Sequence, residues 1–419
     1  MYLNRGFLFV SVCFLFLLAA ACTGPPGPEG PVGPAGVPGP VGPPGPAGED
    51  GAPASQEYVG SEKCGECHDS QYARFMLSGH PYKLTEVTGA PPTFPYDGIT
   101  GGVPNPPEGY TWAEISYVIG GFGWKARFID QNGYIITGDT SAATQYNLPN
   151  EALDTPGEWV PYHPGEQLPY DCGGCHTTGY RPQGHQNNME GIVGTWALPG
   201  IQCEACHGPG SLHANDPYGM DVKIDRSSQL CGKCHVRNDP AIIDAADGFA
   251  RHHEQYEDLY NSKHFALTCV TCHDPHSSAL YEDEIVNPNA GIMQACETCH
   301  WQAETQNNPR HGPVDCIDCH MPPMAKSAVA DVAQFTAHVS AHQFSINPDP
   351  DAPQFSEDGT QVMPYITLSY ACQHCHNGEF YSERSLEELA LAANGYHDPP
   401  TPTPQPTAEP VEGEGTPTP

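Results

Sequence analysis

Basic residues are scarce in this chain of 419 residues. Lysine and arginine together number 16, against 50 aspartates and glutamates, which gives a formal net charge of −34 at pH 7. A chain of this sign is a poor partner for nucleic acid. Apolar residues make up only 38%, whereas glycine and proline number 45 and 46. That fraction is thin for a core of this length unless another group supplies buried apolar surface.

Cysteines that could form disulfides are also lacking. Of the 18 cysteines, 16 belong to eight copies of Cys-x-x-Cys-His, and the other two, Cys13 and Cys22, lie in or at the end of an N-terminal apolar run. Two thiols in this order bind the vinyl groups of one porphyrin, and the following imidazole binds its iron. We therefore expect eight covalent haem c groups, held by Cys64, Cys67, Cys172, Cys175, Cys203, Cys206, Cys231, Cys234, Cys269, Cys272, Cys296, Cys299, Cys316, Cys319, Cys372 and Cys375. The iron ligands from the motifs are His68, His176, His207, His235, His273, His300, His320 and His376.

Structural zinc is the competing interpretation of paired cysteines. Zinc does not require histidine after each pair, and histidine is only 21 of the 419 residues. Finding it after all eight pairs by chance has a probability on the order of 10⁻¹¹. A disulfide oxidoreductase needs only one such motif. Both alternatives are disfavoured.

The second axial ligand decides between electron transfer and catalysis, because an open iron admits substrate. Thirteen histidines lie outside the motifs, and we predict eight of them as ligands: His80, His185, His213, His253, His264, His276, His311 and His342. His252 is the alternative to His253, and His338 the alternative to His342. His163, His374 and His397 are not predicted as ligands, and Met321 or Met324 is a less favoured choice.

Repeated contexts support some of these assignments. QYARFMLSGH ends at His80 and QYEDLYNSKH ends at His264, with apolar residues spaced as on one face of a helix. We expect both histidines on that apolar face. Four residues separate His264 and His311 from the motif that follows each of them, and in both cases a proline lies two residues after the motif histidine. His213 and His276 follow their motifs after glycine or proline.

The ends of the chain differ from the middle. Residues 1–21 predict an export signal, and the small residues before Cys22 resemble a lipidation site, with a plain secretory signal as the alternative. Glycine at every third position from Gly24 to Gly51 predicts a stalk within residues 22–54, either a collagen-like homotrimer or a single-chain polyproline spacer. Residues 398–419, rich in proline and threonine, are expected to be disordered.

Residues 55–397 form the expected haem domain. We predict mainly short α-helices and irregular loops wrapped around a haem stack. Within an insert of about residues 85–165, β-branched and aromatic residues flank an Asn-Gly turn at Asn132 and Gly133. This pattern predicts a small β-hairpin between the first two haems.

The motif contexts resemble a known family. YVGSEKCGECH, CEACHGPGSLH, SKHFALTCVTCHDPH and HGPVDCIDCHMP are similar to the multihaem c-type cytochromes. These include the tetrahaem cytochrome of ammonia oxidisers, the pentahaem nitrite reductases and the octahaem hydroxylamine oxidoreductases. The resemblance covers residues 57–376 and implies closely packed haems, mostly with two axial histidines. All eight motifs end in histidine, unlike the lysine-marked catalytic haem of the nitrite reductases, and the stalk belongs to neither enzyme pattern.

The favoured function is electron transfer outside the cytoplasm, on a membrane face or cell surface, or else in the periplasm or medium. Expected partners are redox proteins or extracellular electron acceptors, with the membrane reached through a lipid anchor at Cys22. One alternative is an octahaem oxidoreductase of small nitrogen or sulfur compounds such as hydroxylamine, nitrite or tetrathionate, with one open haem. A second is a subunit of a cytochrome filament.

Overall fold

The computed structural model describes most of the predicted haem domain. Its described residues are 56–95, 102–103, 105–150, 153–252, 254–278, 291–304, 311 and 314–397. The chain divides into two compact units, Met1–Ala54 and Ser55–Pro419, and every described residue belongs to the second. The predicted signal, Cys22, the stalk, the tail and His253 lie outside the described residues. Within the described part, no helix has the length and apolarity needed to cross a membrane.

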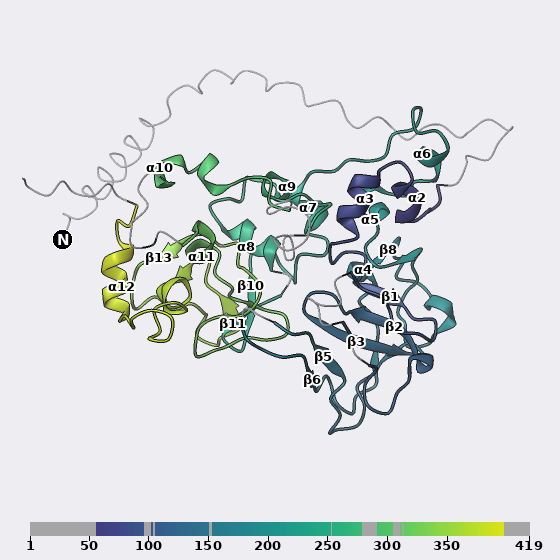
Figure 1. Ribbon diagram of the computed structural model, residues 1–419, viewed down its shortest axis with the longest axis horizontal. Helices are drawn as coiled ribbons and strands as arrows, with labels where there is room; N and C mark the ends of the chain where they lie inside the picture. Colours follow the sequence, from purple (N-terminus) through teal and green to yellow (C-terminus); the bar gives the residue numbers. More distant parts are fainter. Residues whose placement is uncertain are drawn as a thin grey trace, which may run out of the picture. The chain divides into compact units, whose positions relative to one another are not determined.

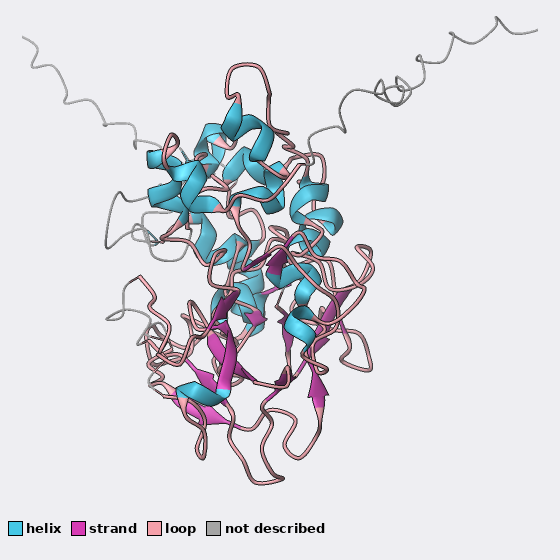
Figure 2. Cartoon of the chain, turned by 90° about the vertical axis from the view of Figure 1, so that its right-hand side faces the viewer, coloured by secondary structure: helices cyan, strands magenta, loops and turns pink. Residues whose placement is uncertain are grey.

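The helices are short (Figures 1 and 2). Most of them carry or border a Cys-x-x-Cys-His motif. In the motifs that begin at Cys64, Cys231 and Cys372, the histidine N–H donates to the carbonyl of that cysteine at 2.9 Å. A single helical turn therefore presents both thiols and the imidazole. The helices are α2 (Ser61–Gly65), α3 (Asp69–Phe75), η1 (Trp112–Glu114), α4 (Gly173–His176), η2 (Gln186–Asn188), α5 (Cys203–His207), α6 (Ser211–Asn215), α7 (Ser228–Cys231), α8 (Gln255–Asn261), α9 (Cys269–Cys272), η3 (Cys296–Thr298), α10 (Trp301–Glu304), α11 (Cys316–His320), η5 (Ser369–Gln373) and α12 (Leu386–Ala393).

A seven-stranded antiparallel sheet lies between the first two motifs in sequence. Its main path runs β1-β2-β3-β4-β7, and β5 pairs with β3 and β6. The strands are β1 (Leu84–Glu86), β2 (Ile115–Gly120), β3 (Lys125–Asp130), β4 (Tyr134–Ile135), β5 (Gln145–Asn147), β6 (Glu158–Val160) and β7 (Leu168–Pro169). The predicted hairpin at Asn132 and Gly133 is present as the β3–β4 connection, where Gly133 has φ +91°. The sequence predicted this hairpin but not the other strands of the sheet.

Both faces of this sheet are buried. Val118 and Phe128 pack in one apolar cluster, whereas their strand neighbours Tyr117 and Ile129 pack in another. Five consecutive residues of β2 are buried. A strand covered on both faces needs apolar residues at every position, which explains why this segment masses hydrophobic residues instead of alternating them. The sheet is thus a rigid support for the side chains at its edges.

Three smaller sheets were missed by the sequence analysis. The first has the order β12-β11-β10-β14, and the others are the pairs β13-β15 and β8-β9. Strands of two to four residues give too few positions for a period to be read. Their bounds are β8 (Thr177–Thr178), β9 (Leu198–Pro199), β10 (Ile243–Ala246), β11 (Phe249–Arg251), β12 (Ala325–Lys326), β13 (Ile346–Asn347), β14 (Gln361–Val362) and β15 (Ile366–Thr367).

The placement of His80 and His264 on helix faces was wrong. Helices α3 and α8 end at Phe75 and Asn261, so both histidines lie beyond them. In the second repeat the Ser262 hydroxyl donates to the Leu259 carbonyl at 2.9 Å and accepts the N–H of His264 at 3.0 Å. The Ser78 hydroxyl makes the matching contacts before His80, at 2.7 and 3.4 Å. The shared Ser-x-His is therefore a turn that leads the chain out of the helix.

One buried carboxylate joins the first motif to the third. Glu204, in the CEACH sequence, is 3% exposed. Its oxygens accept the backbone N–H groups of Val59 at 2.9 Å, Gly60 at 2.9 Å and Gly210 at 2.7 Å. Because the charge is buried and bonded to three N–H groups, it fixes helix α2 against helix α5.

We expect Glu204→Gln to destabilise the fold. The amide loses the charge and one acceptor and leaves a buried N–H without a partner, at a cost of about 1–3 kcal/mol. The measurement is urea unfolding of the haem-loaded protein followed by far-UV circular dichroism. Glu66→Gln is the control, because that carboxylate is exposed and pairs with Lys63. Equal midpoints for the two variants would contradict the role of Glu204.

Candidate functional site

Motif helices lie side by side in pairs. Helix α2 contacts α5, α7 contacts α9, and α11 contacts η5. The positions of the thiols agree with this pairing, since Cys64 lies beside Cys203 and Cys231 beside Cys269. A further sulfur contact joins the second motif to the fourth, through Cys175 and Cys234. Groups attached to these sulfurs would be close neighbours, which suits electron transfer between them.

Seven of the eight motif histidines face a second histidine. Two metal–imidazole bonds of about 2 Å on opposite sides of one iron, with the depth of each ring, place ring centres about 6 Å apart. The separations found are 6.2 Å for His68–His213, 6.3 Å for His80–His235, 6.2 Å for His207–His276, 5.8 Å for His264–His300, 6.0 Å for His273–His342, 6.1 Å for His311–His376 and 5.9 Å for His320–His397. The gap between the two rings of each pair therefore matches the space that one iron would occupy.

The predicted second ligands fall into three groups. Six take part in these pairs: His80, His213, His264, His276, His311 and His342. His185 is exposed, has no histidine ring against it in the described part of the chain, and uses Nδ1 to bond the Ile192 carbonyl at 2.6 Å. His253 lies outside the described residues.

His397 was missed by the sequence analysis, yet its ring faces that of His320. It stands at the end of the domain without a motif or a repeated context, so no local signal identified it. The other histidines have different surroundings. The His338 Nε2 accepts the Ala328 N–H, the His163 Nδ1 pairs with the Glu166 carboxylate, and the His374 Nδ1 bonds the Tyr370 carbonyl.

Burial keeps several of the paired rings neutral. It lowers the pKa of His80 to about 3 and that of His342 to about 4. Neighbouring histidines lower both further, His235 in the case of His80 and His273 in the case of His342. Neutral imidazole is the form that binds a metal.

The second ring nitrogens are held in ways typical of metal ligands. The Nδ1 groups of His207, His213 and His320 lie 2.8, 2.6 and 2.7 Å from backbone carbonyl oxygens. Such a bond fixes the tautomer and leaves Nε2 for the iron. The other acceptors are the Gln255 amide for His235, the Tyr396 hydroxyl for His311, the Ser382 carbonyl for His376 and the Asp274 carboxylate for His276.

Apolar side chains beside the motifs also fit a porphyrin. Phe265 is 70% exposed, Trp301 61% and Ile317 52%, and all three lie within four residues of a motif cysteine. Large apolar side chains are usually covered in a folded protein. A haem at each motif would cover them and supply the apolar surface that the composition lacks.

The motif at Cys172–His176 is different. No histidine ring lies against His176 among the described residues. Three cations lie near it instead, Lys83, Arg127 and Lys125. Burial lowers the pKa of His176 to about 4, and these cations add to the shift. The Nδ1 of His176 bonds the Lys83 carbonyl at 3.0 Å.

The large sheet positions these cations. Lys125 and Arg127 are two residues apart on β3, so they point to the same face. Arg127 lies 3.5 Å over the ring of Tyr162 and donates to Gln145 at 2.7 Å. Burial, Arg127 and two further cations lower the pKa of Lys125 to about 7. A buried cation that is costly to charge favours an anion beside it.

Comparison with known proteins agrees with this arrangement. Residues 158–208 match the family model of cytochrome c554 and c-prime. A segment of 149 residues, 33% of this chain, is 24% identical to the multihaem cytochrome MtrA of Shewanella baltica, of which it spans only 39%. Among solved structures, the octahaem sulfite reductase MccA of Wolinella succinogenes superposes over 82% of this chain and 71% of its own, with a TM-score of 0.54 and 17% identity. The outer cell wall cytochrome OcwA covers 80% of this chain with a TM-score of 0.47 and 19% identity, matching 86% of its own length.

The motifs, the histidine pairs and these matches show that the chain is similar to the multihaem c-type cytochromes, which carry covalently bound haem c. Its fold is similar to that of an octahaem reductase.

The ring planes predict two kinds of low-spin haem. Perpendicular axial imidazoles leave two iron d orbitals nearly equal in energy and give a strongly anisotropic electron paramagnetic resonance (EPR) signal, whereas parallel rings give a rhombic one. The planes of His80–His235, His264–His300 and His311–His376 cross at 85–90°, and those of His207–His276, His68–His213 and His320–His397 at 1–26°. Low-temperature EPR of the oxidised protein should show both classes, about three haems in each.

The same measurement tests the ligand that the sequence did not reveal. His397→Ala should remove one rhombic signal and create a high-spin haem, while His163→Ala should leave the spectrum unchanged. An unaltered spectrum in His397→Ala would contradict the pairing with His320.

Proposed function

We propose that this chain is an extracytoplasmic octahaem oxidoreductase, in which seven haems with two histidine ligands exchange electrons with an eighth at His176 that binds substrate. The observation that carries the proposal is the contrast in ligation. Seven motif histidines face a second histidine at 5.8–6.3 Å, and His176 does not face one in the described part of the chain.

The residues have distinct roles in this proposal. Cys172 and Cys175 would hold the haem, and His176 would bind its iron on one side. The haem would supply one-electron redox chemistry and a coordination position for a small molecule. Lys83, Lys125 and Arg127 would attract and orient that molecule by charge. The contact between Cys175 and Cys234 supports an electron route to the fourth motif.

The local charge supports an anionic substrate. The chain has only 16 lysines and arginines among 419 residues, yet three of them lie near one motif. Cations inside a protein are stable only when they are paired. Among the small nitrogen and sulfur compounds that the sequence offered as the substrates of an alternative function, this favours oxyanions such as nitrite or sulfite.

The location of the protein follows from residues outside the described part. The predicted export signal and the covalent haems support a place outside the cytoplasm. A lipid anchor at Cys22 and the glycine-rich stalk, as a trimer or a spacer, would hold the haem domain away from a membrane. Net charge of −34 favours a cationic redox partner.

A second candidate is a pure electron carrier. The seven histidine pairs and the sulfur contacts between motifs favour it, because a chain of closed, adjacent haems conducts without binding substrate. In that case a residue outside the described ranges, such as His253, would close the eighth haem.

Spin-state counting distinguishes the two candidates. An oxidised protein with an open haem should show seven low-spin haems and one high-spin haem, and nitrite or sulfite should convert the high-spin signal. Eight low-spin haems that ignore both anions would overturn the enzyme proposal and establish the carrier. If His253→Ala then created a high-spin haem, the eighth ligand would be identified.

Anion binding at the open haem should weaken as the pH rises through about 7. Lys125 has a pKa of about 7, so it is cationic below that pH and neutral above it. Lys125→Met should weaken nitrite binding at pH 6 about tenfold, by loss of one charged contact, and should flatten the pH profile. Optical titration measures both effects. Lys63→Met, an exposed cation paired with Glu66, is the control. An unchanged profile in Lys125→Met would contradict the assignment.

A further inference from the structure

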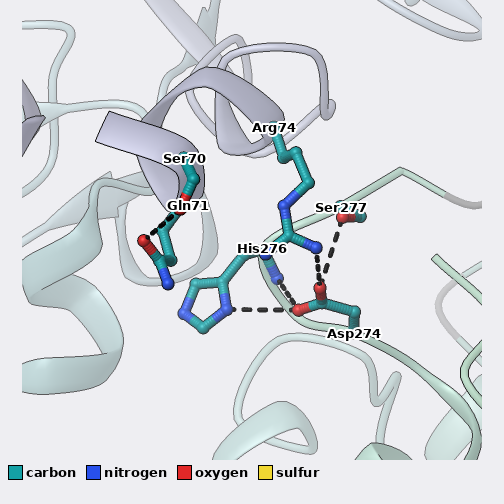
Figure 3. Close-up of polar contacts among 6 residues, drawn as sticks. All are labelled: Ser70, Gln71, Arg74, Asp274, His276 and Ser277. Atoms are coloured by element: carbon teal, nitrogen blue, oxygen red, sulfur yellow. Dashed lines mark hydrogen bonds and ion pairs between the residues drawn. The ribbon is translucent and has the colours of Figure 1, made fainter. Parts of the chain in front are cut away.

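One carboxylate contacts a paired histidine through the ring nitrogen that faces away from the iron. Asp274 follows the fifth motif, and its Oδ1 lies 3.1 Å from the Nδ1 of His276 (Figure 3). The ring of His276 faces that of His207. Its Oδ2 accepts a hydrogen bond from the Arg74 guanidinium at 2.6 Å. We propose that Asp274 lowers the reduction potential of the haem between His207 and His276, and that Arg74 limits the size of this effect.

The geometry fixes the carboxylate firmly. The backbone N–H of His276 donates to Oδ1 at 2.9 Å, and the hydroxyl of Ser277 reaches Oδ2 at 3.4 Å. The side chain of Asp274 is 11% exposed, compared with 36% for Arg74 and 38% for His276. The carboxylate is therefore the most buried of the three groups and is little screened by solvent.

This arrangement is particular to one pair. In the described part of the chain, the other paired histidines that have an Nδ1 partner use a neutral one: a backbone carbonyl, the Gln255 amide or the Tyr396 hydroxyl. The Nδ1 groups of His264 and His342 are buried without a partner. A carboxylate draws the ring proton more strongly than a neutral oxygen does.

The consequence for the iron follows from charge. A carboxylate that pulls the Nδ1 proton increases the negative character of the ring and makes Nε2 a stronger donor. A stronger donor stabilises the ferric state, which carries one more positive charge than the ferrous state. Reduction at this pair is then less favourable than at pairs with a neutral partner.

Arg74 acts in the opposite direction. It belongs to helix α3, which follows the first motif, and it crosses to a residue that follows the fifth. A guanidinium 2.6 Å from Oδ2 withdraws charge from the carboxylate and weakens its pull on His276. Removing Arg74 and removing the charge of Asp274 should therefore shift the same potential in opposite directions. A merely structural role would not produce opposite signs.

The inference rests on the proposed haem ligation by His207 and His276, and it adds a direction to the electron route. Cys206, in the motif of His207, lies near Cys231 and Cys234 of the fourth motif. A low-potential haem in this position passes its electron readily to its neighbour and is the first of the group to be oxidised.

The test is an optical and EPR redox titration of the full haem-loaded protein. Asp274→Asn keeps the shape of the side chain and one acceptor. It should raise one midpoint potential by about 59 mV, which corresponds to a change of about tenfold in the ferrous-to-ferric ratio at that haem. Arg74→Gln should lower the same midpoint. Ser277→Ala, which touches the same carboxylate without charge, should leave it in place.

Haem content and the rhombic EPR signal show whether each variant retains its ligands. If Asp274→Asn and Arg74→Gln both leave every midpoint unchanged, or shift one in the same direction, the inference is overturned. His276→Ala separates this failure from a failure of the ligand assignment. Loss of one low-spin signal in that variant supports the ligation, whereas an unchanged spectrum overturns both the ligation and the inference.

Discussion

The one-turn Cys-x-x-Cys-His unit is the constraint on which the rest of this structure depends. It fixes two sulfurs and one imidazole within a few residues, and helices of four or five residues are sufficient for that purpose. Such helices cannot build a core by themselves, so apolar residues such as Phe265 stay exposed beside the motifs. The large sheet differs, because clusters around Phe128 and Ile129 give it a core made of protein alone. One part of the domain thus depends on its cofactors for folding, and the other supplies a scaffold that does not.

The sequence determines one side of each iron and leaves the other to the fold. The motif histidine is local, whereas its partner arrives from up to 155 residues away in the His80–His235 pair. Spacing cannot encode such a contact. Local context identified His264 because Ser262 shapes the turn before it, but His397 has no such feature. His185 has a plausible context and instead bonds a backbone carbonyl. The repeated Ser-x-His turn marked His80 and His264, whereas nothing in the local sequence marked His397 as a second ligand.

Periodicity failed where polar groups are buried. On helix α8 the apolar residues suggested the inner face, yet Tyr260 is 57% exposed, while Glu257 and Asp258 are fully buried. Asp258 accepts the backbone N–H of His342 at 2.7 Å, and burial raises its pKa to about 7. A buried carboxyl is tolerated here because it is hydrogen-bonded, and its bond orders the backbone of a paired histidine. Hydrophobic patterns do not contain that information.

Electrostatics gives the proposed haem chain a direction. The Asp274 carboxylate would favour the ferric state of a haem at the His207–His276 pair, whereas Lys83, Lys125 and Arg127 would favour the ferrous state at His176, since a nearby cation stabilises the less positive iron. The two sites are linked through the fourth motif, where Cys234 lies beside Cys175 and near Cys206. Electrons would move downhill along this path toward His176. The same three cations would thus attract an anion and draw electrons to it, so that substrate binding and electron supply depend on one feature of the sheet.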